Sequence, residues 1–434
     1  MNKEKPSYPI FTEDMKKDYT ILVPTMIPLQ IGLLTAVMRR YGYNTKMLEN
    51  SGSGVIERGL KYVHNDICYP AQLVIGQLME AVESGEYDTD KLALLITQTG
   101  GGCRASNYIH LLRRALATAG YGHIPVISLN FSSIEKGAAF KMTPSILYQM
   151  MQAVLYGDLL MSLKNQTRPY TRDVDQLDAV IEKWMEKLEA ELLHGKISRR
   201  RVRQNYRCIL RDFSAIPRTG EARRLRVGIV GEIFVKFSPL GNNNLEEFLV
   251  KEGAEVVLPG FFDFCFYCVY NSLVDRRLYG TNALVAAVYR IVYRLMLSRQ
   301  KEIIRIMKKE SDYMPPTPFD HTATLSDGFL DNGMKMGEGW LLTAEMVELI
   351  ESGVESIVCA QPFGCLPNHI AGKGMMKPMK EKYKNVNIVA IDYDSGASRI
   401  NQENRIKLML ANARDVAGQK EKGATIPEKE KTPV

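Results

Sequence analysis

The fold class of this 434-residue chain is decided by the stretch Leu92-Ala93-Leu94-Leu95-Ile96-Thr97-Gln98-Thr99-Gly100-Gly101-Gly102-Cys103-Arg104-Ala105-Ser106-Asn107. Its first five residues form an apolar run with the length and content of a buried parallel strand. A helical pattern follows over residues 107–119, so three glycines and a cysteine lie at a strand-to-helix turn. In an open α/β sheet, such turns lie at the carboxyl ends of the strands, where ligands usually bind. The stretch therefore predicts an α/β fold with a candidate site at this turn.

The residues of the turn suggest the kind of ligand. Gly100, Gly101 and Gly102 would let the backbone approach a bound group closely. The start of a helix favours negative charge and lowers the pKa of a nearby thiol, which suits a thiolate at Cys103 that binds a metal centre. A tight turn with one ordinary buried cysteine explains the same residues, and both interpretations stay open at this point.

Working outward, the chain divides into segments with different patterns. The strand and helix patterns of residues 15–137 predict an N-terminal α/β domain, and those of residues 226–415 predict a second one that includes a strand over 355–359. Residues 138–225 are helical and basic, and a long helical pattern at about 272–309 is interrupted near Gly280. Residues 416–434 are rich in Lys, Glu and Pro and are expected to be a disordered tail. The predicted architecture is therefore two Rossmann-like, open parallel-sheet domains joined by a helical segment.

Composition limits the class of protein. The chain is 45% hydrophobic and 24% charged, which is typical of a globular protein. It has no run of about 18 apolar residues and no apolar segment of a secretory signal near its first residue, so we expect a cytoplasmic protein without a membrane partner. Seven cysteines in such a chain argue against a disulfide framework and for metal, redox or inert buried roles.

Positive charge is concentrated in residues 196–226. This segment has eleven Lys or Arg residues against Asp212 and Glu221, a net charge of +9 in a chain whose total is +7. A basic patch could attract nucleic acid, a CoA phosphate or an acidic protein. The segment lacks the interleaved aromatic residues that stack on single strands, so no nucleic-acid partner is expected. A solvated basic connector is the simpler interpretation.

Four cysteines, Cys68, Cys103, Cys359 and Cys365, fall in loops before helices or at strand ends, two in each predicted domain. A cleft between the domains could bring them together, and thiolates at helix starts fit iron–sulfur ligation. The single Cys-x-x-Cys sequence consists of Cys265 and Cys268 and lies among aromatic residues. These two cysteines are either further ligands in a dry environment or buried apolar residues of the core.

Polar residues near the cysteines are candidates for substrate chemistry. His64 and His369 each lie within four residues of a candidate ligand and could donate a proton to substrate or a hydrogen bond to a cluster sulfur. Arg104 and Asn107 could orient a carboxylate or phosphate. Helix capping or simple solvent exposure would also explain the two histidines.

Four segments also carry a family resemblance: Asn65-Asp66-Ile67-Cys68-Tyr69-Pro70-Ala71; Thr97 to Tyr108; Gly231-Glu232-Ile233 with Ser238-Pro239-Leu240-Gly241-Asn242-Asn243; and Gln361-Pro362-Phe363-Gly364-Cys365-Leu366-Pro367-Asn368-His369. They resemble the 2-hydroxyacyl-CoA dehydratase superfamily. The resemblance is greatest to the C-terminal region of acyl-CoA dehydratase activase-related proteins, and the double-cubane cluster proteins are relatives. It covers about residues 18–412.

The resemblance implies an oxygen-sensitive iron–sulfur cluster, [4Fe–4S] or double-cubane [8Fe–9S], held by cysteines between two α/β domains. By position, Cys68, Cys103 and Cys365 match the cluster-binding loops best, followed by Cys359. It also implies a separate ATP-dependent iron–sulfur activator protein that supplies low-potential electrons, and assembly as a homodimer or heterodimer. The cluster would serve dehydration of a 2-hydroxyacyl-CoA or reduction of a small molecule under anaerobic conditions. The alternative is a non-catalytic, cluster-bearing subunit for electron transfer or activator binding.

Overall fold

The computed structural model describes residues 8–98, 102–129, 142–195, 197–220 and 223–424. It contains two four-stranded sheets in which every strand pairing is parallel. The strands are β1 (Thr20–Val23), β2 (Thr45–Met47), β3 (Leu92–Thr97), β4 (Val126–Leu129), β5 (Leu225–Gly231), β6 (Ala254–Val257), β7 (Ser356–Pro362) and β8 (Asn387–Tyr393). The prediction of an α/β fold with two open parallel sheets is confirmed.

Both faces of the first sheet are covered by helices, which explains the continuous apolar run that forms β3. Leu94 packs in one core with helices α4 and α5, whereas its neighbour Leu95 packs in another core with Met38 of α2. A parallel strand covered on both faces needs an apolar side chain at every position. The helices of this first part are α1 (Met15–Asp18), α2 (Pro28–Arg40), α3 (Ser53–Tyr62), α4 (Tyr69–Glu83) and α5 (Tyr108–Thr118), with short 3-10 turns η1 (Thr89–Lys91) and η2 (Arg104–Asn107).

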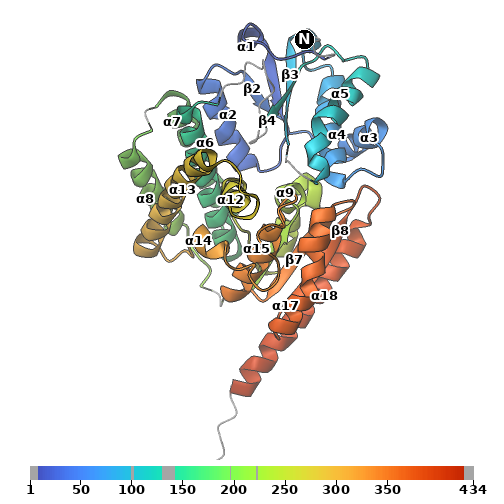
Figure 1. Cartoon of the computed structure of the whole chain (residues 1–434). Coiled ribbons are helices and arrows are strands. Elements are labelled where there is room, and N and C mark those ends of the chain that lie inside the picture. Colours follow the sequence, from blue (N-terminus) through green and yellow to red (C-terminus); the bar gives the residue numbers. More distant parts are fainter. Residues whose placement is uncertain (1–7, 99–101, 130–141, 196, 221–222, 425–434) are drawn as a thin grey trace, which may run out of the picture.

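The two sheets share one strand order. The first runs β2-β1-β3-β4 and the second β6-β5-β7-β8, so the first strand of each lies between the second and third. This order places a topological switch point between β1 and β3, and another between β5 and β7, where α/β proteins bind ligands. Figure 1 shows the first domain in blue beside the green and orange strands of the second.

The helices of the second part are α9 (Ile233–Phe237), α10 (Pro239–Asn242), α11 (Leu245–Lys251), α12 (Phe261–Tyr279), α13 (Ala283–Glu310), α14 (Phe319–Thr322), α15 (Trp340–Glu351), α16 (Leu366–Ala371), α17 (Met376–Lys382) and α18 (Arg399–Ala424), with η4 (Lys373–Met375). The predicted interruption near Gly280 is confirmed, because Gly280 ends α12 with a φ of +65°.

Helix α18 continues to Ala424, past residue 416 where the tail was expected to begin, and residues 425–434 lie outside the described residues. No helix in the described ranges combines the length and apolar character needed to cross a membrane.

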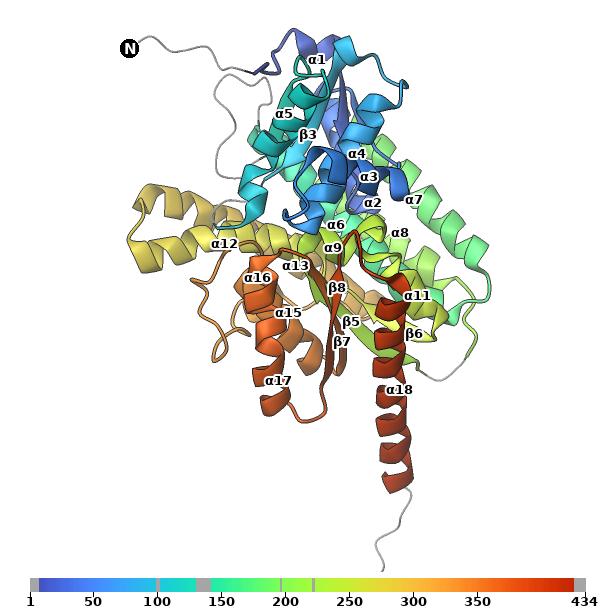
Figure 2. The ribbon, with the colours of Figure 1, turned by 90° about the vertical axis from the view of Figure 1, so that its right-hand side faces the viewer.

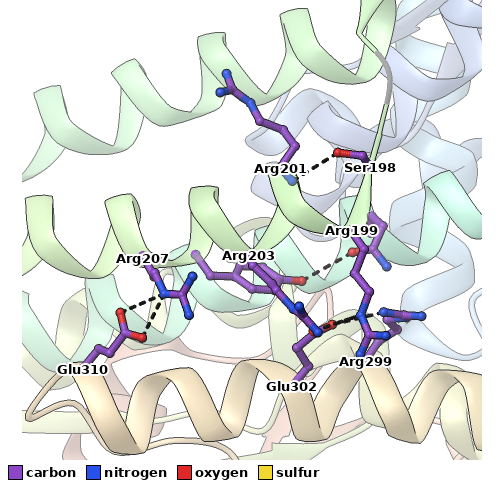
Figure 3. Close-up of polar contacts among 10 residues, drawn as sticks. Ser198, Arg199, Arg201, Arg203, Arg207, Arg299, Glu302 and Glu310 are labelled. Carbon is purple, nitrogen blue, oxygen red and sulfur yellow. Dashed lines mark hydrogen bonds and ion pairs between the residues drawn. The ribbon is translucent and has the colours of Figure 1, made fainter.

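Three helices and the 3-10 turn η3 (Arg168–Tyr170) connect the domains: α6 (Pro144–Thr167), α7 (Val174–His194) and α8 (Arg199–Ser214). Much of the basic charge of this segment is neutralised within the molecule (Figure 3). The side chain of Glu302 on α13 is only 6% exposed and forms ion pairs with three arginines. Arg199 and Arg203 belong to α8, and Arg299 belongs to α13 itself. Arg207 pairs with Glu310 at 2.9 Å. Arg199, Arg203 and Arg207 therefore fix α8 to α13.

Candidate functional site

Three predicted ligands occupy equivalent local positions, each immediately before a helix. Cys68 is the N-cap residue of α4, Cys103 that of η2 and Cys365 that of α16. All three have extended backbones, with ψ of 143°, 143° and 95°, and α4 and α16 each carry a proline in their first turn. Proline suits that position because its missing N–H would have no helical partner there. We call these residues the three N-cap cysteines.

An amide group at the start of η2 contacts the sulfur of Cys103, and amides near the starts of α4 and α16 influence the thiols of Cys68 and Cys365. The N–H of Ala105 donates to Sγ of Cys103 at 3.4 Å. Burial is the largest influence on Cys68 and Cys365 and raises the pKa of both thiols, while backbone amides of Ala71 and Asn368, respectively, act in the opposite direction. Free N–H groups at a helix start stabilise a thiolate. Cys103 therefore has a backbone donor for its anionic form, whereas the side chains of Cys68 and Cys365 make no capping hydrogen bond with the described residues of their helices.

Close backbone contact joins the loops of the two domains. The N–H of Tyr69 donates to the carbonyl of Phe363 at 3.1 Å. Gly364 has a φ of +70°, and a Cβ there would lie 3.1 Å from Cα of Cys68. A Cβ on Gly337, at φ +57°, would lie 3.8 Å from Sγ of Cys103 and 3.0 Å from Pro367. Glycine at these two positions thus allows the loops of Cys68, Cys103 and Cys365 to meet between the domains.

Two carboxyl groups lie beside the three N-cap cysteines. Glu232 directly follows β5, and its Oε2 accepts the N–H of Val235 at 2.9 Å. Glu338 accepts the N–H of Ile233 through Oε1 at 3.1 Å. Burial, and then the charge of Glu338, raises the pKa of Glu232 to about 8. Burial is the largest cause of the raised pKa of Cys365. The charges of Glu338 and Glu232 raise this pKa further, and the charge of Cys103 has a smaller effect in the same direction.

Two tyrosines complete this environment. The hydroxyl of Tyr108 lies 3.1 Å from Sγ of Cys68. Burial, followed by the charges of Cys68 and Glu232, raises the pKa of Tyr108 well above its ordinary value. Burial raises the pKa of Tyr267 well above its ordinary value, the side chain of Asn271 acts in the opposite direction, and the charges of Glu338 and Cys103 add to the rise. Among the described residues, the buried Oε2 of Glu338 has no hydrogen-bond partner. Buried polar groups without partners are uncommon and often lie where a ligand or water binds.

The structure does not bring Cys359 to this place. Strand β7 extends to Pro362, so Cys359 lies within the strand and packs in the core between the second sheet and α15. Its Sγ lies 3.5 Å from Oδ1 of Asn368. Burial, and then Asp392, raises the pKa of Cys359 to about 12, which favours the neutral thiol.

The cysteines of the Cys-x-x-Cys sequence lie one turn apart on α12. Burial, and then the charge of Glu338, raises the pKa of Cys268 to about 12. The pKa of Cys265 is raised by burial, then by Cys268 and by Asp158 and Asp263. No disulfide joins the seven cysteines, all of which are described.

The predicted polar residues lie at the surface around the site. Nη1 of Arg104 donates to the carbonyl of Asp66 at 3.0 Å and so ties the Cys103 loop to the Cys68 loop. His64 is exposed, and its Nδ1 accepts the N–H of Asp66 at 3.2 Å. His369 and Asn107 are also exposed. Gly102 is exposed beside Cys103, whereas Gly100 and Gly101 lie outside the described residues.

Within the described ranges, no three His, Cys, Asp or Glu side chains are close enough together to hold a metal ion. A cavity of about 140 Å³ lies elsewhere, and its lining includes Asp158, Asp263 and Glu348 but none of the cysteines. The three N-cap cysteines are therefore neighbours in space without forming a compact site for one ion.

Sequence reasoning missed Glu232, Glu338, Tyr108 and Tyr267 as members of the site. Glu232 could have been noticed, because a carboxylate directly after a buried strand lies at the ligand-binding edge of a parallel sheet. Glu338 lies 106 residues further along the chain, in a loop with no comparable signal. No protein-family model matches this chain, and a search of the curated proteins returned no match.

Proposed function

We propose that this protein is an iron–sulfur protein of the 2-hydroxyacyl-CoA dehydratase type, with Cys68, Cys103 and Cys365 as cluster ligands. The single observation that carries the proposal is the meeting of three N-cap cysteines from three loops of two domains. Thiolates are the preferred protein ligands of iron–sulfur clusters. The sequence resemblance independently assigns the same three cysteines to the cluster.

The donor set and its surroundings fit such a cluster better than a single ion. A cubane distributes its cysteine ligands over separate corners, so it spans ligands that are too far apart for one metal ion. The amide of Ala105 bonds to Sγ of Cys103, and hydrogen bonds of this kind would tune the sulfurs of a bound cluster. Cys268 is the further candidate ligand, because its thiol is influenced by Glu338 at the edge of the site.

When bound, the cluster supplies single electrons at low potential, received from an ATP-dependent iron–sulfur activator, for radical dehydration of a 2-hydroxyacyl-CoA or reduction of a small molecule. Glu232 has a pKa of about 8 and holds a proton at neutral pH. It can donate that proton to a leaving hydroxyl group beside Cys365. The guanidinium of Arg104 is exposed near Cys103, and its nitrogens other than Nη1, which bonds to Asp66, can orient an anionic group.

Anaerobic purification of the full chain tests the proposal. We expect a brown protein that contains iron and acid-labile sulfide, with a Mössbauer spectrum that defines the cluster type. Cys68→Ala, Cys103→Ala and Cys365→Ala should each lose most of the iron, because each removes one ligand. Cys208→Ala is the matched control, since Cys208 packs against the helical core around α8 and should be dispensable for iron.

Two further measurements sharpen the result. Cys359→Ala should retain iron, because the side chain of Cys359 packs within a core. Titration with a 2-hydroxyacyl-CoA separates an enzyme, which binds it saturably, from the alternative electron-transfer subunit, which does not. A protein that stays free of iron after reconstitution with iron and sulfide would exclude the cluster.

A further inference from the structure

Helices α12 and α13 form an antiparallel hairpin whose outer end carries an uncovered apolar face. Figure 2 shows this hairpin, in yellow, projecting from the body of the molecule. Its C-terminal part is held by the ion pairs between α8 and α13. Its outer part, from residue 276 to 295, consists mostly of exposed residues.

The exposed apolar residues of α13 follow one helical stripe. Leu284, Val288, Ile291 and Leu295 are spaced by four, three and four residues, and we call them the α13 seam. The exposed fractions of the first three are 78%, 59% and 68%. Spacings of three and four keep side chains on one face of a helix, as in the contact seam of a coiled coil. The seam is about 18 Å long at 1.5 Å per residue.

The opposite face of α13 already has its partner within the chain. Ala286 and Met296 are buried, and the ring of Tyr293 contacts Phe266 and Tyr270 of α12 at 5.7 and 5.6 Å between centroids. The helix is therefore apolar on two faces, and only one of them packs against described residues. Because scattered exposed apolar residues need no explanation but a continuous stripe does, the seam indicates a protein-binding surface.

The charges around the seam indicate which charge the partner carries. Residues 276–301 contain no Asp or Glu. Arg277, Arg290 and Arg294 are exposed, and among the described residues none of them has an ion-pair partner. A second copy of the chain would bring arginines against arginines, which is unfavourable. A helix with acidic residues beside its apolar stripe would pair with them.

We propose that the α13 seam is the docking site for an amphipathic helix of another protein, whose apolar stripe is flanked by Asp or Glu. The apolar side chains supply the contact area, and the arginines select the partner by charge. This inference is independent of the cluster, because the seam contains none of the proposed ligands.

The test uses the full chain and two designed helical peptides with the same Leu and Ile stripe, one flanked by Glu and the other by Lys. Fluorescence anisotropy should show saturable binding of the Glu peptide, with the Lys peptide at least about tenfold weaker. Ile291→Glu should weaken the binding of the Glu peptide by about tenfold or more, because it puts a charge within the seam. Ile400→Glu is the matched control, since Ile400 is 69% exposed on α18 and should leave binding unchanged.

A charge-reversed variant makes the test decisive. Arg290→Glu combined with Arg294→Glu should reverse the preference, so that the Lys peptide binds more tightly. Equal binding of both peptides, or no effect of Ile291→Glu, would overturn the proposal. Sedimentation of the chain alone as a dimer that Ile291→Glu dissociates would assign the seam to a second copy instead. Binding to anionic lipid vesicles that depends on Ile291, without peptide binding, would assign it to a membrane surface.

Discussion

At the scale of single residues, Lys236 is the feature on which a group of buried carboxyls depends. Its Nζ lies 2.7 Å from Oε1 of Glu345, and the two side chains are 5% and 3% exposed. Burial raises the pKa of Glu345 and also of Asp263 and Glu338, while the Lys236 ammonium opposes each rise. Lys236 belongs to α9, which directly follows Glu232, so this ion pair holds α9 and α15 together beside the candidate site.

We expect Lys236→Met to destabilise the protein by about 3–5 kcal/mol, because it leaves the carboxyl of Glu345 buried without its partner. The double variant Lys236→Met with Glu345→Leu should lose much less stability, since it removes both charges. Urea unfolding of the four proteins of this double-mutant cycle measures the effect. Losses that simply add in the double variant would show that the pair does not interact in this way.

The exact end of strand β7, and with it the position of Cys359, could not be predicted from the sequence. The predicted strand 355–359 ends three residues before β7 does, so Cys359, expected at the end of the strand, lies in its interior. Strand ends are difficult to predict because Ala360 and Gln361 suit a strand and a loop equally well. By contrast, Cys68 precedes Pro70 by two residues, and that local signal correctly indicated a helix start.

At the scale of elements, the crossing of α3 and α4 sets the direction of the helix that begins at Cys68. The two backbones touch at glycines: a Cβ on Gly76 would lie 2.1 Å from the carbonyl oxygen of Val55, and one on Gly59 would lie 2.3 Å from that of Gln72. Backbone atoms cannot move aside as flexible side chains do, so any side chain here would separate the helices. No pattern in the sequence indicated this close crossing.

We therefore expect Gly76→Ala to destabilise the protein by roughly 2–3 kcal/mol or more, because the added methyl group must displace α3. Gly122→Ala is the matched control, since its Cβ would meet Ala117 at an ordinary 3.6 Å. Thermal unfolding of both variants gives the comparison. Equal melting temperatures for Gly76→Ala and the unchanged protein would contradict the crossing described above.

At the scale of the whole molecule, the fold was predictable because each parallel strand is a short apolar run between helices. The meeting of the two domains was not, since Tyr69 contacts Phe363 across nearly three hundred residues and no local pattern records that contact. The same packing that joins the domains also buries charge. Burial raises the pKa of Asp158 to about 6 and that of Glu348 to about 7.

These shifts predict how stability depends on pH. For Glu348 the folded-state pKa lies above its ordinary value of 4.5, so the folded state binds the proton more tightly than the unfolded state. Its contribution is fully present below about pH 4.5 and is lost as pH rises through about 7. We expect the free energy of unfolding to fall over this range and Glu348→Gln to remove on the order of 2 kcal/mol of that fall. Urea unfolding at a series of pH values measures it, and an unchanged slope in Glu348→Gln would count against the assignment.

The shared strand order places residues of the candidate site at corresponding positions in the two sheets. Cys103 follows β3 and Cys365 follows β7, which are equivalent strands of the two sheets. Cys68 is the N-cap of α4, the α-helix that precedes β3. Glu338 lies one residue before Gly339, which is the N-cap of α15, the α-helix that precedes β7. The two halves thus place different groups at corresponding places, a thiol before α4 and a carboxylate close to the start of α15. The site is therefore unsymmetrical although the two sheets around it share one strand order, and a ligand bound there would meet two chemically different ends.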